Sequence, residues 1–250
     1  MDTNLIAKIE ETTTVKYIFC DYYDTVIHRR VHPLQPLWAW AKKIKAKFGM
    51  PISTNVLYEI RKQAINRLEK ETGLINTELD YKMVHQEIYD LLIRRKILKP
   101  SITFKSFFEY SAEADFQSES SVQYSNKKMV ATLQYLKDNK YVIYCVSDFY
   151  TDEDSITKLI DYHGISHLYD KVIVSSTQNA SKENKGILYK KLIDKEGISP
   201  EQIFMIGDNK KSDYINAKRH GIAAYHLKRY KQKVLQKLFF AVFLVGRYVF

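Results

Sequence analysis

The chain has 250 residues, of which 45% are hydrophobic, so it can bury a large core and global disorder is excluded. The formal net charge is +10, but six basic residues and no acidic ones lie from Lys228 onward, and the remainder carries only +4. This uneven charge, with no zinc-type spacing and no Walker loop, argues against a nucleic-acid-binding core. Two cysteines disfavour a disulfide framework, and residues 1–11 lack a secretory pattern, so we expect a cytoplasmic protein.

The hydrophobic pattern alternates between strand and helix, with one long helical interruption. Residues 15–20 form an apolar run that predicts a buried strand. Stretches with helical spacing follow it at 34–48, 55–71, 77–96 and 103–114. A polar stretch at 117–121 then precedes a return to alternation. Further helices are predicted at 126–139, 152–162, 186–196 and 213–219, and further strands at 141–146, 171–174, 203–206 and 222–226.

This order of elements predicts a Rossmann-like α/β fold, in which a doubly wound parallel sheet is covered on both faces and carries an inserted helical cap. We expect the core at 1–29 and 118–227, the cap at 30–117 and a basic, apolar tail at 228–250. The insertion follows the first strand directly, so the cap would stand over the carboxyl ends of the strands. The tail's apolar run at 238–245 is shorter than the ~20 residues that cross a bilayer. That tail could lie on a membrane, bind a partner or pack on the core.

Acidic residues follow two of the predicted strands. Asp21 and Asp24 come after the first strand, and Asp208 and Asp213 come after the strand at 203–206. Ligands of open α/β sheets bind at the carboxyl ends of the strands. Carboxylates that meet there can hold a hard cation such as Mg²⁺, and one of them can act as a nucleophile.

The order of these motifs resembles the haloacid dehalogenase-like hydrolase superfamily, with the insertion in the place of its C1-type helical cap. The resemblance covers about 15–226. The motifs that carry it are Asp21-Tyr22-Tyr23-Asp24-Thr25, Val146-Ser147-Asp148-Phe149-Tyr150 and Gly207-Asp208-Asn209-Lys210-Lys211-Ser212-Asp213. The resemblance implies a Mg²⁺-dependent phosphatase that acts on a small phosphorylated metabolite through an aspartyl-phosphate intermediate.

The resemblance also implies roles for individual residues. Asp21 would be both the nucleophile and a metal ligand. Asp208 would bind Mg²⁺ directly, with the backbone carbonyl of Tyr23 as a further ligand and Asp213 in support. The hydroxyl of Ser147 would donate a hydrogen bond to a phosphoryl oxygen.

A lysine near a helix start would neutralise the nucleophile and the phosphoryl group. Lys182 and Lys185 are both candidates, because the usual spacing to the last acidic motif falls between them. Both therefore remain open at this point.

One position departs from the phosphatase pattern. These phosphatases carry a second aspartate, which protonates the leaving group, two residues after the nucleophile, and here that residue is Tyr23. Asp24 follows it, where glycine is common. Either Asp24 supplies the proton, or the substrates have good leaving groups, or catalysis is poor, since losing a general acid costs about 10²–10⁴-fold. Haloacid dehalogenases also carry tyrosine there and use no metal, but they lack the acidic ending at 207–213, so a metal-dependent dehalogenase is a more distant alternative.

The main alternative function belongs to another class. The motifs look like a branch of which some members accompany glycosyltransferases or polysaccharide gene clusters. This protein could thus be a catalytically weak or inactive partner protein in such a pathway. Tyr23 and the basic tail favour that hypothesis, whereas Asp21 and Asp208 favour the enzyme. The expected partners are a small phosphorylated substrate and no nucleic acid, with a peripheral membrane or protein contact through 228–250 left open.

Overall fold

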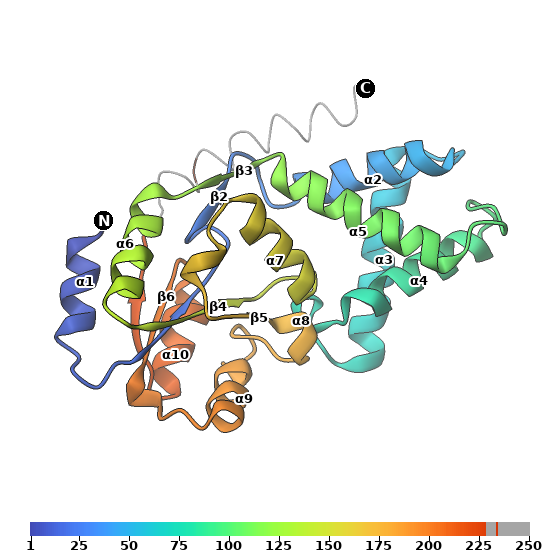
Figure 1. The fold of residues 1–250 in the computed structure, drawn as a ribbon. Coiled ribbons are helices and arrows are strands. Elements are labelled where there is room, and N and C mark those ends of the chain that lie inside the picture. The colour runs from blue at the N-terminus through green and yellow to red at the C-terminus, as the bar shows by residue number, and fades with distance from the viewer. Residues whose placement is uncertain (229–233, 235–250) are drawn as a thin grey trace.

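The structure is a computed structural model, and it describes residues 1–228 and 234 (Figure 1). At the centre of this described part is a five-stranded parallel sheet in the order β5-β4-β1-β6-β7. The strands are β1 (Tyr17–Cys20), β4 (Val142–Ser147), β5 (Lys171–Val174), β6 (Ile203–Gly207) and β7 (Ala223–His226). Since β1 lies between β4 and β6, residues that follow these three strands end at the same edge of the sheet.

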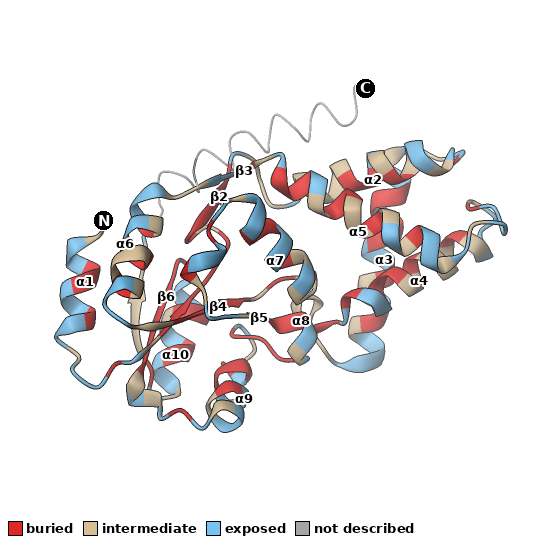
Figure 2. Cartoon of the chain, in the orientation of Figure 1, coloured by how far each residue is buried: buried red, intermediate tan, exposed pale blue. Residues whose placement is uncertain are grey.

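Helices cover both faces of the sheet. Ile18 and Cys20 of β1 belong to one hydrophobic cluster, and Phe19 between them belongs to a second, as the two-residue period of a strand requires. The first cluster includes residues of α1 (Thr3–Glu10), α6 (Lys127–Asp138) and α7 (Glu153–Tyr162), and the second includes residues of α9 (Ile187–Glu196) and α10 (Asn216–Arg219). Shorter turns are η2 (Ser166–Leu168), α8 (Ser175–Gln178), η3 (Pro200–Gln202) and η4 (Lys210–Ile215). The central strands β1, β4 and β6 are buried almost throughout (Figure 2), and helices lie on both faces, which confirms the predicted doubly wound α/β fold.

Residues 30–120, all of which the structure describes, form a helical group beside the sheet (Figure 1). Its elements are α2 (Gln35–Phe48), α3 (Thr54–Thr72), η1 (Asn76–Glu78), α4 (Tyr81–Arg94) and α5 (Phe104–Ser120). These helices have a hydrophobic cluster of their own, which includes the fully buried side chains of Trp40, Leu57 and Phe107. The helical group therefore packs around a separate core.

A short antiparallel ribbon connects this helical group to the sheet. Strand β2 (Ile27–Arg29) leads into the group and β3 (Gln123–Ser125) leads out of it, with Ile27 opposite Ser125. Because the outgoing and returning strands are paired, the helical group starts and ends at one place, immediately after the turn that follows β1.

Two of the helices predicted in the cap have different limits. The helix predicted at 77–96 starts as a 3₁₀ turn that ends at Glu78, and α4 begins only after Asp80, whose carboxylate caps it by accepting a backbone N–H at 2.7 Å. The helix predicted at 103–114 continues through a polar last turn. That turn is buried, with Glu119 only 1% exposed, because its side chains find partners inside the protein.

Within the described part of the chain, no helix has both the length and the apolar character needed to cross a membrane. The expectations for the tail at 228–250 concern residues outside the described ones, apart from Lys228 and Val234.

Candidate active site

Carboxylates from three places in the chain meet at the carboxyl edge of the sheet. Asp21 follows β1, Asp208 follows β6, and Asp213 lies in η4. The backbone N–H of Asp21 donates to the carbonyl of Ile206 at 2.9 Å, which extends the pairing of β1 with β6 to the site itself. One oxygen from each of the three carboxylates lies within 4.8 Å of the others, and all three residues are buried.

Gly207 allows this close approach. A Cβ atom at that position would lie 2.2 Å from Oδ2 of Asp213, so any side chain there would displace the carboxylate. Asp213 Oδ2 also accepts the backbone N–H of Asn209 at 2.9 Å. The chain here forms a π-helical turn, Lys210–Ile215, which is capped by Asn209 and continues into α10 at Asn216. The helix predicted at 213–219 therefore begins earlier, at Lys210, and its first part is π-helical.

Lys182 is the lysine that lies among the carboxylates. Its Nζ is 2.8 Å from Oδ1 of Asp21 and 2.8 Å from Oδ1 of Asp213, and the residue is 1% exposed. Lys185 is exposed and has a left-handed backbone, with φ of 52°. Its carbonyl accepts a hydrogen bond from His220. The structure thus brings Lys182 to the site and leaves Lys185 on the surface.

Two further carboxylates hold the segment that carries Lys182. Asp148, directly after β4, accepts the backbone N–H groups of Lys182 and Glu183, each at 2.9 Å. Glu78 of η1 accepts the N–H and the hydroxyl of Ser181 at 3.0 and 2.8 Å. Neither role was predicted from the sequence. The position of Asp148 after a strand was the available signal, and nothing local marked Glu78.

Negative charge exceeds positive charge around Asp21. Burial is the main cause that raises its pKa well above the usual value, and Asp213 and Asp208 raise this pKa further while Lys182 opposes them. Burial disfavours the charged form of Lys182, yet the pKa of Lys182 is raised because Asp21, Asp213 and Asp148 surround it. An oxygen-only ligand set with an excess of negative charge fits a hard divalent cation such as Mg²⁺.

Tyr23 occupies the position at which a proton donor was expected. Its ring stacks on Phe149 with centroids 4.0 Å apart, and the guanidinium carbon of Arg29 lies 3.9 Å from the Tyr23 ring centroid. The Tyr23 hydroxyl is buried and has no hydrogen-bond partner within the described residues. Burial raises the pKa of this hydroxyl well above its ordinary value, so Tyr23 is a poor acid.

Asp24 and Arg29 lie with Asp21 in a pocket of about 230 Å³. Asp24 has φ of 61°, a left-handed conformation that explains why glycine is common at its position. Arg29 is ion-paired with Glu119 at 3.2 Å, and sequence analysis did not identify it. The pocket is lined by Asp21, Tyr23, Asp24, Arg29, Thr77, Asp148, Phe149, Lys182, Glu183, Asp208, Asn209, Ser212 and Asp213.

Ser147 is the last residue of β4 and is fully buried. It is not among the residues that line this pocket. Its hydroxyl has no hydrogen-bond partner in the part of the chain that the structure describes. An unpartnered buried hydroxyl is costly, so a ligand oxygen that accepted its hydrogen bond would relieve that cost.

Comparison with known proteins identifies one family and several solved structures of similar fold. The family model for haloacid dehalogenase-like hydrolases matches residues 15–221. A search of curated proteins finds no match.

Solved structures match at low sequence identity. A HAD phosphatase from Thermococcus onnurineus is 18% identical, with 87% of this chain and 88% of that one covered and a TM-score of 0.56. A 2-haloacid dehalogenase from Pseudomonas syringae is 13% identical, with 84% and 85% covered and a TM-score of 0.62. A HAD family enzyme from Bacteroides thetaiotaomicron, in complex with magnesium and inorganic phosphate, is 19% identical, with 86% and 94% covered and a TM-score of 0.53. At these identities the likeness establishes the fold alone.

Proposed function

Since the chain belongs to the haloacid dehalogenase-like hydrolases, we propose that it is a Mg²⁺-dependent phosphatase acting on a small phosphorylated metabolite. The observation that carries this proposal is the buried cluster of Asp21, Asp208 and Asp213, two of which, Asp21 and Asp213, pair with the ammonium group of Lys182. In this proposal Mg²⁺ is held by Asp21, Asp208 and the backbone carbonyl of Tyr23, with Asp213 in support. The cation would offset the negative charge of the carboxylates and of the phosphoryl group. The phosphatase from Thermococcus and the magnesium and phosphate complex from Bacteroides support the choice of substrate class.

The proposed reaction has two displacements at phosphorus. A carboxylate oxygen of Asp21 forms a bond to phosphorus while the bond to the leaving oxygen breaks, and that oxygen keeps the electron pair. Water then attacks phosphorus, inorganic phosphate leaves, and the Asp21 carboxylate is restored. Lys182 balances negative charge next to Asp21, and the hydroxyl of Ser147 donates to a phosphoryl oxygen.

Residues 30–117, which make up most of the helical group, are proposed to act as the cap, over a core formed by 1–29 and 118–227. The pocket supports this division, because Thr77 of the helical group lines it together with Asp21 of the core. We also propose that the protein works in a reducing compartment such as the cytoplasm, since both of its cysteines, Cys20 and Cys145, are free and buried.

Tyr23 leads to an expectation about leaving groups. Its buried hydroxyl cannot replace an aspartate as proton donor, and Asp24 is the carboxylate beside it that lines the pocket. Aryl and acyl phosphates, whose leaving groups need no proton, should react faster than alkyl phosphates. If Asp24 is the acid, Asp24→Asn should lower the rate of hydrolysis of alkyl phosphates selectively. Tyr23→Asp should reduce the difference in rate between alkyl phosphates and the aryl and acyl phosphates.

The deciding experiment is a screen of sugar phosphates, nucleotides, acyl phosphates and aryl phosphates, with and without Mg²⁺. Release of phosphate should require Mg²⁺ and should disappear in Asp21→Asn. Equal rates on aryl and alkyl substrates that Asp24→Asn leaves unchanged would show that the proton comes from elsewhere. No Mg²⁺-dependent turnover by the folded protein would instead favour the catalytically weak partner protein. A parallel assay of halide release from 2-haloacids tests the dehalogenase alternative.

A further inference from the structure

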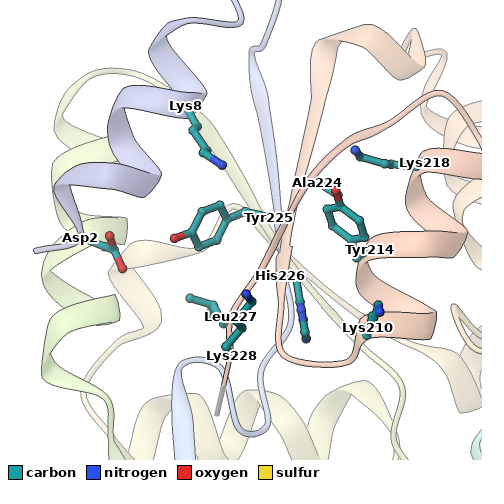
Figure 3. Close-up of a pocket in the computed structure, with 10 residues that line it drawn as sticks. All are labelled: Asp2, Lys8, Lys210, Tyr214, Lys218, Ala224, Tyr225, His226, Leu227 and Lys228. Carbon is teal, nitrogen blue, oxygen red and sulfur yellow. The ribbon is translucent and has the colours of Figure 1, made fainter. Parts of the chain in front are cut away.

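A larger hollow lies at the outer edge of β7, and none of the described residues that line it also lines the pocket around Asp21. We call it the β7 groove, and its volume is about 740 Å³. Residues 224–228 line it along the strand (Figure 3). Lys8 of α1 reaches it from one side, and Lys210 and Lys218 reach it from the other.

The β7 groove carries unbalanced positive charge. Among the described residues, its lining includes Lys8, Lys210, Lys218 and Lys228 but one carboxylate alone, Asp2. That carboxylate is already ion-paired with the Nζ of Lys128 at 3.0 Å and also caps α1. Among the described residues, no carboxylate forms an ion pair with any of the four groove lysines. The lysines are therefore left to attract an anion from solution.

Aromatic rings position two of these lysines. The Nζ of Lys8 lies 5.3 Å from the ring centroid of Tyr225, and the Nζ of Lys218 lies 4.5 Å from that of Tyr214. In Figure 3 both lysines extend toward the strand between them. Strand β7 is also an edge strand of the described sheet and pairs with β6 alone. The outward N–H groups of this edge, with which no other described strand pairs, are thus additional donors beside the lysines.

We propose that the β7 groove binds a polyanion of the phosphate class, a ligand with two or more linked phosphate groups. Four lysines that approach from both sides of one strand match several linked charges better than a single phosphate. Their arrangement around a hollow favours a compact anion over a flat membrane surface. This site does not depend on the proposed hydrolysis, because the groove and the carboxylate cluster are lined by different residues.

Calorimetric titration of the full chain with tripolyphosphate in EDTA tests the proposal. The wild type should bind one equivalent, and the double variant Lys8→Gln/Lys218→Gln should bind at least about tenfold more weakly, because two of the converging charges are lost. Lys8→Arg/Lys218→Arg, which keeps both charges, should stay within about threefold of the wild type. The matched control is Lys82→Gln/Lys190→Gln, which removes two exposed lysines outside the groove and should also stay within that range.

Several results would overturn the assignment. Unchanged affinity in the groove double variant would show that these lysines do not form the site, and an equal loss in the control would show that only net charge matters. A marked change in affinity on Asp208→Asn would place the ligand in the catalytic pocket. If anionic vesicles or a DNA duplex bound more tightly than tripolyphosphate through the same lysines, the ligand of the groove would be a membrane or a nucleic acid and not a polyphosphate.

Discussion

Lys182 lies between two carboxylates with almost no access to water, so its charge has to be balanced inside the protein. Breaking a buried ion pair by removing one partner leaves the other charge uncompensated. Here the loss would leave both Asp21 and Asp213 without their cation. Lys182 is thus expected to matter for stability as well as for the reaction.

We predict that Lys182→Met lowers the free energy of unfolding by about 3–5 kcal/mol. The same change should lower kcat by about 10²–10³-fold, because the phosphoryl group loses a preorganised positive charge. Lys185→Met is the matched control and should change stability by no more than about 0.5 kcal/mol, since that side chain is exposed. Urea unfolding and kcat on an aryl phosphate measure both effects. Similar losses in the two variants would contradict the assignment of Lys182.

Asp148 makes stability depend on pH. Burial raises its pKa to about 6 in the folded protein, although Lys182 opposes this, whereas an unfolded aspartate titrates near ~3.9. The folded state therefore holds this proton more tightly, so the contribution of Asp148 to stability is full below pH ~4 and is lost as the pH rises through about 6.

Asp148→Asn should remove this pH dependence. The difference in unfolding free energy between wild type and variant should change between pH ~4 and ~6 and level off above that window. Urea unfolding at a series of pH values, in EDTA, measures it. A difference that is the same at every pH would show that Asp148 does not titrate in this range.

At the scale of elements, the turn η1 is where the helical group contacts the core next to Lys182. The carboxylate of Glu78 accepts both hydrogen bonds from Ser181, the residue before Lys182. The carbonyl of Thr77 accepts a further one from the hydroxyl of Ser175. These contacts tie the position of the helical group to the segment that carries Lys182.

Glu78→Ala should lower kcat by about tenfold with little change in KM, because a loss of roughly 1–3 kcal/mol in hydrogen bonding frees the Lys182 segment. Glu78→Gln, which keeps one acceptor oxygen, should restore most of the activity. Glu71→Ala on the exposed surface of α3 is the control. A loss of thermal stability with unchanged kcat would show that Glu78 stabilises the fold but does not position Lys182 for the reaction.

At the scale of the whole molecule, core strands that are distant in the sequence converge on one buried acidic cluster. Asp21 and Asp208 come from neighbouring strands of the sheet, and their mutual repulsion disfavours the compact state unless a cation is present. Binding of a divalent cation to the folded state alone should therefore stabilise the entire fold.

Mg²⁺ at a hundred times its dissociation constant should raise the free energy of unfolding by about 2.7 kcal/mol, and EDTA should reverse this. Asp208→Asn should abolish most of the increase, whereas Asp138→Asn, which removes an exposed carboxylate, should keep it. Thermal unfolding across a Mg²⁺ titration gives the result without any substrate. An equal increase in all three proteins would mean that Mg²⁺ acts elsewhere.

The sequence by itself determined the alternation of strands and helices, the family and the two acidic motifs. These are local properties, because the burial of a strand shows in its own apolar run and Asp21 and Asp208 directly follow such runs. The limits of some helices, by contrast, could not be predicted from the neighbouring residues in the sequence. The last turn of α5 is polar in composition, yet Glu119 is buried because Arg29 and Tyr150 from other elements bind it.

Only the tertiary structure decided which lysine belongs to the site and what positions it. Lys182 and Lys185 flank the same turn. Hydrogen bonds from the backbone around Lys182 to Asp148 and Glu78 hold Lys182, and not Lys185, at the site. Glu78 lies 103 residues from Ser181 in sequence, a distance over which no periodic pattern carries information. The β7 groove depends on packing in the same way. Three of its lysines come from α1, η4 and α10, and they meet Lys228, which follows β7, only when these elements flank one edge strand.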